Sequence, residues 1–486
     1  MGNIRIDYRT LKAQVNAQAK RLWELGVRPG THVAVICPAR PEFFVSFLAI
    51  TSLGAVYQGL SPKSAAPELA YQVSDSGVGL LLWHGDLANE VAAKQVAAAV
   101  THPVTVLQGD ALQLVDGDEF TPPAEMVSAM AAVKGDTPAA IVYTSGTTGR
   151  PKGAMLTQYG FTACSYIQVQ RWTGTEPPRM PCIEPINHVS SIGDGCTFLL
   201  VAGGTVVFQE QFQPEQMLRL IVEEKCNLWY TDPAVLSLCT RSPEWELTDL
   251  SRLDRICWSG GRAPLSLAEK VAGRVPRVGT SWGMTETVGS LTYTDDEASL
   301  EVLSSTIGRL SPEYEGRVVC DDGREAGRGE TGELQVRGRH IVQSYWNMPE
   351  VTRKAFTEEG WFKTGDLVTV WDDGNLELVG RRSEMYKSGG ENIYPAEVEA
   401  ALEAHPAVSA AVVVSVPDEL WGEVGYTFLI PHGEVSVEEL REHLRKHLAR
   451  FKVPKVIEFI PEFPLMPNGK VDRRALKSAA SKEVAQ

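Results

Sequence analysis

The sequence predicts an α/β fold in which a large N-terminal domain of helix-covered β-sheets is followed by a small α+β domain. Three observations support this prediction. The chain has 486 residues, a length that favours two or more domains. Short apolar runs alternate with stretches of helical spacing over most of the chain. After residue 382 the pattern changes to that of a smaller unit, so we predict domains over 1–382 and 383–486.

The N-terminal domain begins with a helix and a buried strand. Four apolar residues recur at helical spacing near the start: Leu11, Val15, Ala19 and Leu22. A turn at Pro29-Gly30 then leads into an apolar strand over 32–37. The stretch 43–62 carries no charge, but its polar and glycine residues favour a buried helix followed by a strand over a membrane span.

The later elements follow from turn and capping signals. Apolar runs over 367–370 and 376–379 flank Asp373-Gly374, which predicts a β-hairpin. In the small domain we expect a helix from Pro395, a strand over 408–416, and a helix that a capping box begins. That box and the buried stripe of its helix consist of Ser436 with Glu439, and Leu440, Leu444 and Leu448.

Composition excludes several classes of protein. The formal charge is −15 and no dense Lys/Arg patch is present, which disfavours a nucleic-acid partner. The eight cysteines are scattered and form no CxxC pair, as in proteins of a reducing compartment. The N-terminus lacks the apolar stretch of a signal peptide. We therefore expect a cytoplasmic protein with no transmembrane segment.

A loop rich in hydrogen-bond donors follows the short apolar run over 139–143. Two glycines and four hydroxyl residues occupy six successive positions, and a lysine adds positive charge close behind. Such a loop can wrap polyphosphate oxygens, whereas a common P-loop is excluded because Pro151 precedes the lysine and 154–156 looks extended. The candidate phosphate-binding residues are Thr144, Ser145, Gly146, Thr147, Thr148, Gly149 and Lys152.

This loop resembles the phosphate loop of the adenylate-forming superfamily, which includes acyl-CoA synthetases, amino-acid adenylation domains and beetle luciferases. Six further motifs resemble that family in the same order along the chain. They are Gly260-Gly-Arg-Ala-Pro264, Ser281-Trp-Gly-Met-Thr-Glu-Thr287, Thr331-Gly-Glu-Leu334 with Tyr345-Trp-Asn347, Thr364-Gly-Asp-Leu367 with Gly380-Arg381, Lys387-Ser-Gly-Gly-Glu-Asn-Ile393, and Pro467-Asn-Gly-Lys470.

The resemblance implies that a carboxylate attacks the α-phosphorus of ATP and forms an acyl-adenylate. Both reactants are anions, so the site must supply positive charge. Lys470 is the implied catalytic cation, Thr285 is expected to hydrogen-bond the α-phosphate, and Glu286 is expected to bind Mg²⁺. Asp366 and Arg381 are expected on the ribose side. The implied adenine side comprises Gly260, Gly261, Arg262, Trp282, Gly283 and Met284, with Trp282 standing where the family more often has Tyr.

The resemblance further implies a second half-reaction with coenzyme A. In this family the small domain rotates, so that Lys470 leaves the site and the loop Lys387, Ser388, Gly389 and Gly390 arrives. Ser383 occupies the pivot, where Asp or Lys is usual. Trp421 matches a tryptophan that packs on the CoA adenine in aryl-CoA ligases, and Lys455 is expected to meet a CoA phosphate. The alternative for Trp421 is a half-buried core residue.

The acid itself is only partly constrained. His188 resembles a gate at the acyl pocket, and the alternative is a core histidine satisfied by hydrogen bonds. Asn187 is neutral where amino-acid adenylation domains carry Asp, and Asp194 lies beyond the motif, so a substrate without an α-amino group is favoured. No charged residue obviously reaches the pocket floor. An uncharged aromatic, alicyclic or medium-chain acid therefore fits.

Other functions stay open on the sequence. The leading prediction is an AMP-forming acid–CoA ligase that uses ATP, Mg²⁺ and coenzyme A. A stand-alone enzyme that loads a carrier protein and a luciferase-like oxygenase share the same motifs. A catalytically inactive nucleotide-binding regulator is a further alternative, against which Lys470, Glu286 and Asp366 argue. A homodimer stays open as well.

Overall fold

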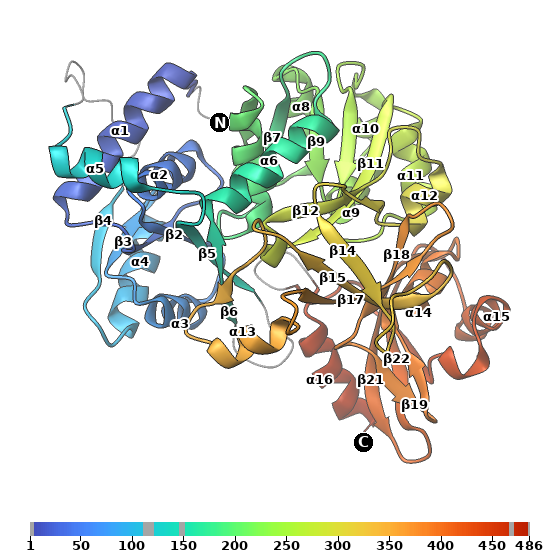
Figure 1. Cartoon of the computed structure of the whole chain (residues 1–486). Helices are drawn as coiled ribbons and strands as arrows, with labels where there is room; N and C mark the ends of the chain where they lie inside the picture. The colour runs from blue at the N-terminus through green and yellow to red at the C-terminus, as the bar shows by residue number, and fades with distance from the viewer. Residues whose placement is uncertain (1–3, 110–120, 145–150, 466–470, 485–486) are drawn as a thin grey trace. The chain divides into compact units, whose positions relative to one another are not determined.

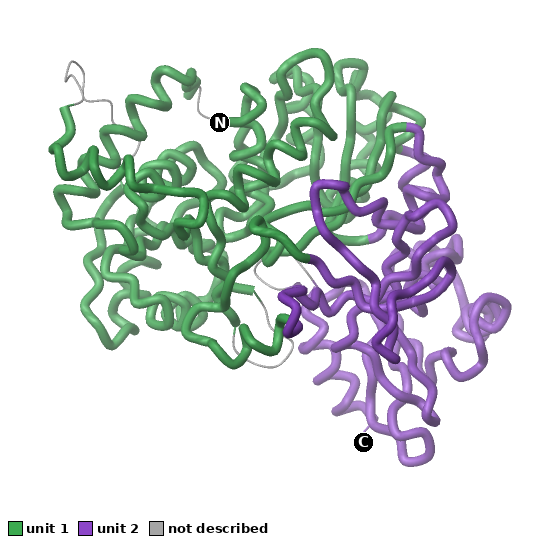
Figure 2. Tube along the Cα trace, viewed as in Figure 1, with its two compact units in different colours: residues 1–261, 271–296, 337–356 green, residues 262–270, 297–336, 357–486 purple. Residues whose placement is uncertain are grey.

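The computed structural model describes residues 4–109, 121–144, 151–465 and 471–484. The chain forms two compact units that interleave along the sequence (Figure 2). Unit 1 comprises residues 1–261, 271–296 and 337–356, and unit 2 comprises residues 262–270, 297–336 and 357–486. The domain boundary near residue 382 stays a prediction.

A seven-stranded sheet occupies the first part of unit 1, with the strand order β16-β6-β5-β2-β1-β3-β4 (Figure 1). Strands β5, β2, β1, β3 and β4 run parallel, whereas β6 and β16 are antiparallel to their neighbours. The strands are β1 (His32–Ile36), β2 (Val56–Leu60), β3 (Leu80–Trp83), β4 (Thr105–Gln108), β5 (Pro138–Thr144), β6 (Lys152–Thr157) and β16 (Ser344–Tyr345).

Helices cover both faces of this sheet, as its apolar strands require. On one face Phe47 of α2 packs edge-on against Tyr57 of β2. On the other face, α3 and α4 bury Leu69 and Ala93 in a core with Ile36 of β1. No helix among the described residues is both long and apolar enough to cross a membrane. The helices are α1 (Tyr8–Glu24), α2 (Pro41–Ser52), α3 (Ala66–Ser76), α4 (Leu87–Ala99) and α5 (Ala124–Ala132).

A second sheet of unit 1 contains the neighbouring strands β12-β11-β10-β9, of which β9, β10 and β11 are parallel. Its strands are β9 (Leu228–Thr231), β10 (Arg255–Trp258), β11 (Arg277–Met284) and β12 (Gly289–Tyr293). Beside it, β7 (Arg179–Cys182) pairs with β8 (Thr205–Phe208). The helices of this region are α6 (Gln158–Trp172), the π-helix η1 (Ser190–Thr197), α7 (Phe198–Val201), α8 (Pro214–Glu223), α9 (Pro233–Arg241), α10 (Glu244–Leu247), the 3₁₀ turn η2 (Thr285–Thr287) and α13 (Pro349–Ala355). Most of α11 (Leu265–Ala272) belongs to unit 2.

Unit 2 contains two sheets, which include the predicted hairpin. The first has the order β14-β15-β17-β18, and the second has the order β20-β19-β22-β21 with β23 also on β22. The strands of the first are β14 (Glu315–Val319), β15 (Thr331–Arg337), β17 (Phe362–Val370) and β18 (Leu376–Arg381); a short strand β13 (Arg309–Leu310) precedes them. The strands of the second are β19 (Tyr386–Ser388), β20 (Glu391–Ile393), β21 (Val408–Asp418), β22 (Gly422–Pro431) and β23 (Val456–Phe459).

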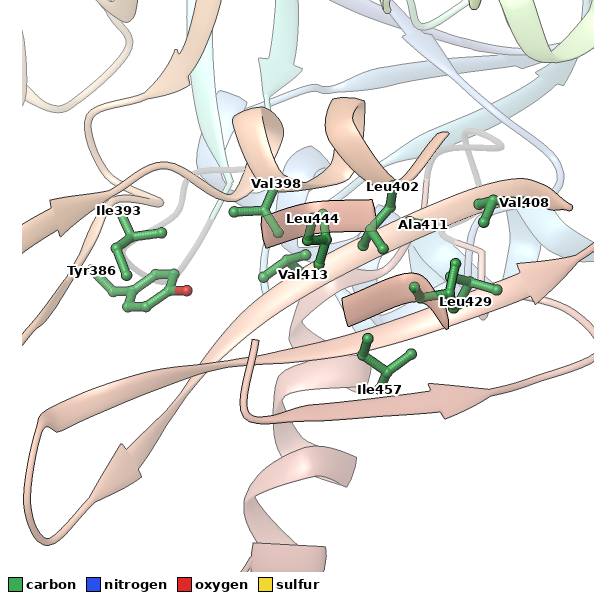
Figure 3. Close-up of a cluster of buried hydrophobic side chains, with 11 residues drawn as sticks. Tyr386, Ile393, Val398, Leu402, Val408, Ala411, Val413, Leu429, Leu444 and Ile457 are labelled. Atoms are coloured by element: carbon green, nitrogen blue, oxygen red, sulfur yellow. The ribbon is translucent and has the colours of Figure 1, made fainter. Parts of the chain in front are cut away.

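The second sheet of unit 2 is covered on both faces, because β21 alternates between two cores. Val413 faces the core that Figure 3 shows, together with Val398 and Leu444. Val412 and Val414 face the other core, with Leu476. The capping contact at the start of α15 is confirmed, since the Ser436 hydroxyl accepts from the Glu439 backbone N–H. The helices are α12 (Leu300–Ser305), α14 (Pro395–Glu403), α15 (Val437–His447), the 3₁₀ turn η3 (Arg450–Lys452) and α16 (Arg473–Val484).

Candidate active site

The turn between β11 and β12 presents Thr285 and Glu286. Its shape depends on Gly283, where a Cβ would lie 2.0 Å from the Gly289 carbonyl oxygen. The Thr287 hydroxyl accepts from the Met284 backbone N–H at 2.9 Å and donates to the Gly289 carbonyl at 2.7 Å. The tight backbone therefore holds the two predicted phosphate and metal residues at one fixed turn.

Tyr345 joins two predicted site residues of unit 1. Its hydroxyl donates to Glu286 Oε1 at 2.7 Å, and Lys152 Nζ lies 4.8 Å from its ring centroid. Glu286 is 6% exposed, so this hydrogen bond satisfies a carboxylate that has little water around it. The Val342 backbone N–H also donates to the Glu286 carbonyl at 2.6 Å. The sequence motif contained Tyr345 but assigned it no role.

The ends of the candidate phosphate loop lie opposite each other in a hairpin. Thr144 of β5 is paired with Lys152 of β6, as the antiparallel register requires. Lys152 thus stands at the loop's exit, beside Tyr345. The central residues Ser145, Gly146, Thr147, Thr148 and Gly149 lie outside the described residues.

The predicted adenine-side residues fall on both units. Gly260 has φ of +85° and follows β10 together with Gly261, and a Cβ at either glycine would meet open space. Trp282 is buried on β11. Its stacking on adenine stays a prediction. Met284 ends the same strand. In unit 2, the Arg262 Nε donates to the Ser304 carbonyl at 3.2 Å.

Asp366 and Arg381 come together in unit 2 on adjacent strands. They are register partners in the β17–β18 hairpin, and Arg381 Nε lies 2.8 Å from Asp366 Oδ1. Gly365, with φ of +74°, donates its backbone N–H to Glu333 Oε1 at 3.1 Å. The Asp366 side chain is buried, whereas that of Arg381 is 44% exposed. The two residues predicted to meet the ribose are thus joined as an ion pair.

A second group in unit 2 forms around Trp421. The turn after β19 contains Gly389 and Gly390, both with positive φ, and follows Lys387 and Ser388. The Gly389 backbone N–H donates to the Trp421 carbonyl at 2.9 Å, and a Cβ at Gly389 would lie 2.7 Å from the Trp421 ring. Trp421 is 52% exposed, so about half of its surface is open to solvent, and its role toward CoA stays a prediction. An exposed indole on a glycine turn suits a planar ligand.

Lys455 lies near this tryptophan but has an ion-pair partner. Its Nζ is 2.5 Å from Asp418 Oδ2, and the other oxygen of Asp418 accepts from the Trp421 backbone N–H. The contact with Lys455 has the largest effect on the Asp418 carboxylate, followed by the backbone N–H groups of Trp421 and Leu420. Together they lower the pKa of Asp418 to about 2. Sequence reasoning missed Asp418, although Asp is a common turn residue whose side chain bonds backbone groups a few residues on.

Lys470 itself lies outside the described residues, but the chain on either side is well anchored. The Asp472 backbone N–H donates to the Pro464 carbonyl at 2.8 Å. At the start of α16, Arg473 forms two hydrogen bonds with Glu399, at 2.7 and 2.8 Å. The helix that follows the predicted catalytic lysine is therefore fixed to α14.

The predicted acyl-side segment contains a buried acidic network. His188 Nδ1 lies 2.7 Å from the Ser190 hydroxyl. Asp194 lies in the π-helix η1 and is 3% exposed, with hydrogen bonds from Gln168 and from the Tyr230 hydroxyl. Burial raises the pKa of Asp194 to about 7. The sequence assigned no role to this carboxyl group.

Fold and sites together define an α/β protein of two units, with a loop-bearing hairpin and a buried carboxylate in the first. A family model described as AMP-binding enzyme matches residues 1–346, and one described as AMP-binding enzyme C-terminal domain matches residues 397–470. The chain belongs to the AMP-binding enzyme family.

Relatives and solved structures agree with this assignment. The chain is 33% identical to a feruloyl-CoA synthase of Amycolatopsis sp, over 97% of this chain and 93% of that protein. It is 31% identical to a long-chain-fatty-acid–CoA ligase of Mycobacterium tuberculosis, over 99% and 94%. The o-succinylbenzoate CoA synthetase of Bacillus subtilis, solved with its acyl-adenylate intermediate, superposes with a TM-score of 0.84 at 30% identity, over 97% and 93%. The predicted family and fold class are confirmed, as is the prediction of an AMP-forming acid–CoA ligase at the level of the family.

Proposed function

We propose that this protein activates a carboxylic acid with ATP as an acyl-adenylate and then transfers the acyl group to coenzyme A. The observation that carries the proposal is the contact of Lys152 and Glu286 with one tyrosine, Tyr345. Tyr345 thus contacts both a cation at the exit of the loop and a buried carboxylate.

The first half-reaction joins two anions. A carboxylate oxygen of the acid attacks the α-phosphorus, and the bond from that phosphorus to the bridging oxygen of pyrophosphate breaks. Positive charge placed where negative charge develops is the largest expected contribution to the rate. Lys152 contributes at the phosphates, and Lys470 at the carboxylate and α-phosphate.

Mg²⁺ fits the donor set at Glu286. The ion prefers hard oxygen ligands and is usually bound through one or two carboxylates together with substrate phosphates. Glu286 supplies such a carboxylate, and Tyr345 fixes the orientation of one of its oxygens. When bound, the ion would neutralise phosphate charge. Thr285, on the same turn, contributes a hydroxyl donor toward the α-phosphate.

We assign the ribose contacts to unit 2. The Asp366 carboxylate accepts hydrogen bonds from ribose hydroxyls, and Arg381 Nε keeps that carboxylate in one orientation. The small C-terminal domain then turns about Ser383. This rotation exchanges the Lys470 segment for the turn that contains Gly389.

The second half-reaction transfers the acyl group. The CoA sulfur attacks the acyl carbon, the bond to the AMP oxygen breaks, and the thiol proton passes to solvent. The exposed Trp421 ring supports the CoA adenine, and Lys455 attracts a CoA phosphate. We place the protein in the cytoplasm, because its scattered cysteines fit a reducing compartment.

Aromatic acids are the first substrate class to test. The relatives include a feruloyl-CoA synthase, an indoleacetate–CoA ligase and several 2-succinylbenzoate–CoA ligases. The name of each of these enzymes gives an acid that contains an aromatic ring. A fatty-acid relative at 31% identity keeps medium-chain and long-chain acids in the panel.

The test is a panel of acids incubated with ATP, Mg²⁺ and CoA, with AMP and thioester measured together. We expect acid-dependent ATP–pyrophosphate exchange, and a loss on the order of 100-fold in Glu286→Gln. The matched control is Glu350→Gln, an exposed carboxylate paired with Arg353, which should keep full exchange. An absence of AMP with every acid would sink the proposal.

A further inference from the structure

The hairpin between β21 and β22 contains a charged turn that builds the Trp421 platform. Asp418 ends β21 and is the register partner of Gly422, which begins β22. Only three residues join them, so the position of Trp421 depends on how this short turn is held. Gly422 has φ of +80°, a value that glycine adopts without strain.

One carboxylate holds both sides of this platform. Asp418 Oδ1 accepts from the backbone N–H groups of Leu420 and Trp421, both at 2.9 Å. Asp418 Oδ2 lies 2.5 Å from Lys455 Nζ, across from the turn. The Asp418 side chain is 6% exposed, whereas that of Lys455 is 63% exposed. The carboxylate is therefore the buried half of the contact, and the ammonium faces solvent.

We propose that Asp418 is a positioning residue for the thiol substrate: one oxygen fixes the Trp421 turn, and the other restrains the Lys455 ammonium. The inference rests on the proposed function, because it assigns Trp421 and Lys455 to coenzyme A. The same carboxylate both helps and opposes the binding of CoA. It orders the aromatic platform, and it competes with a phosphate of CoA for Lys455.

Two substitutions at Asp418 separate these effects. Asp418→Asn keeps an oxygen for the backbone donors but removes the charge that restrains Lys455. KM for CoA should then fall about two- to threefold at low salt, as expected for an exposed ion pair. The gain should shrink at high salt because the ammonium–phosphate attraction is screened. Asp418→Ala loses both contacts: losing the cap should raise KM about fivefold, and freeing Lys455 should offset about half of that. The net result should be a rise in KM of about twofold at low salt.

The readouts distinguish positioning from damage to the fold. ATP–pyrophosphate exchange should stay unchanged in both variants, since it does not need CoA. In a Trp421→Ala background, Asp418→Ala should no longer raise KM for CoA, because only the release of Lys455 remains. Glu330→Gln is the control, because it breaks an exposed pair with Arg324 in the same unit, away from Lys455. It should leave KM for CoA and exchange as in the unmodified protein.

Specific results would overturn the inference. One is an equal KM for CoA in the unmodified protein, Asp418→Asn and Asp418→Ala. Another is a rise in KM with Asp418→Asn. A third is a rise in KM from Asp418→Ala in the Trp421→Ala background that is as large as in the unmodified protein. Trp421→Ala with normal KM for CoA would remove the platform itself. Absence of acid-dependent exchange in the unmodified protein would instead overturn the proposed function, and this inference with it.

Discussion

Replacing Asp194 by asparagine tests the buried acidic network of unit 1. Burial raises the pKa of this carboxyl group from 3.8 to about 7, against the opposing effect of its hydrogen bonds from Gln168 and Tyr230. A change of this size corresponds to about 4 kcal/mol in the relative stability of its two protonation states. Asparagine has nearly the same shape but no charge to bury. The substitution therefore isolates the charge from the packing.

The sign follows from proton binding. The folded state holds the Asp194 proton more tightly than the unfolded chain does, so stability falls as pH rises from about 4 to about 7. Above pH 7 the full penalty of the buried charge is present. Relative to the unmodified protein, Asp194→Asn should gain roughly 2.5 kcal/mol of stability between pH 5 and pH 8. For a unit of this size the gain corresponds to a Tm difference of roughly 4 °C.

The assay is thermal unfolding of both proteins at pH 5, 6, 7 and 8, with unit 1 followed by its buried tryptophans. Asp136→Asn is the matched control, because that carboxylate is 63% exposed in a pair with Arg339. Its Tm offset should not change across the range. A constant offset between Asp194→Asn and the unmodified protein would refute the reasoning, since the carboxyl group would then titrate alike in both states.

Three further substitutions test the proposed half-reactions. Tyr345→Phe removes the donor to Glu286 and should slow ATP–pyrophosphate exchange about tenfold, and an unchanged rate would contradict the role of Tyr345. Gly389→Ala places a Cβ 2.7 Å from Trp421 at a φ of +59°, so thioester formation should fall about tenfold while exchange persists. A parallel loss of exchange would count against that division. Lys470→Ala should slow adenylation roughly 100-fold, but spare thioester formation from supplied acyl-adenylate.

Local sequence patterns predicted much of the fold. The Asp373-Gly374 turn predicted the β17–β18 hairpin, which is present. The spacing of Leu11 and Leu22 predicted a helix, and α1 spans Tyr8–Glu24. These elements depend on interactions within a few residues, such as turn geometry and one buried stripe. The π-helix η1 was not predicted, because nothing in its local pattern separates it from an ordinary helix.

The candidate site was predicted in part. Asp366 and Arg381 each belonged to a family motif, but their contact follows from the register of two strands. Roles for Asp418 and Asp194 were missed. Asp194 acts through Gln168 and Tyr230, which are distant in sequence, so motif spacing gives no signal for it. Asp418 accepts from backbone N–H groups two and three residues on, which its turn could have indicated, but its contact with Lys455 depends on the fold.

The sequence by itself determined the family, the order of the elements and the residue types available for binding phosphate and metal. Tertiary structure alone decided which of these residues meet. Tyr345 contacts both Lys152 and Glu286 because β16 pairs with β6, which brings Tyr345 beside Ala154 across almost 200 residues of chain. Burial likewise gives Asp194 its raised pKa. Strand pairing and desolvation depend on the whole fold, and no local pattern encodes either one.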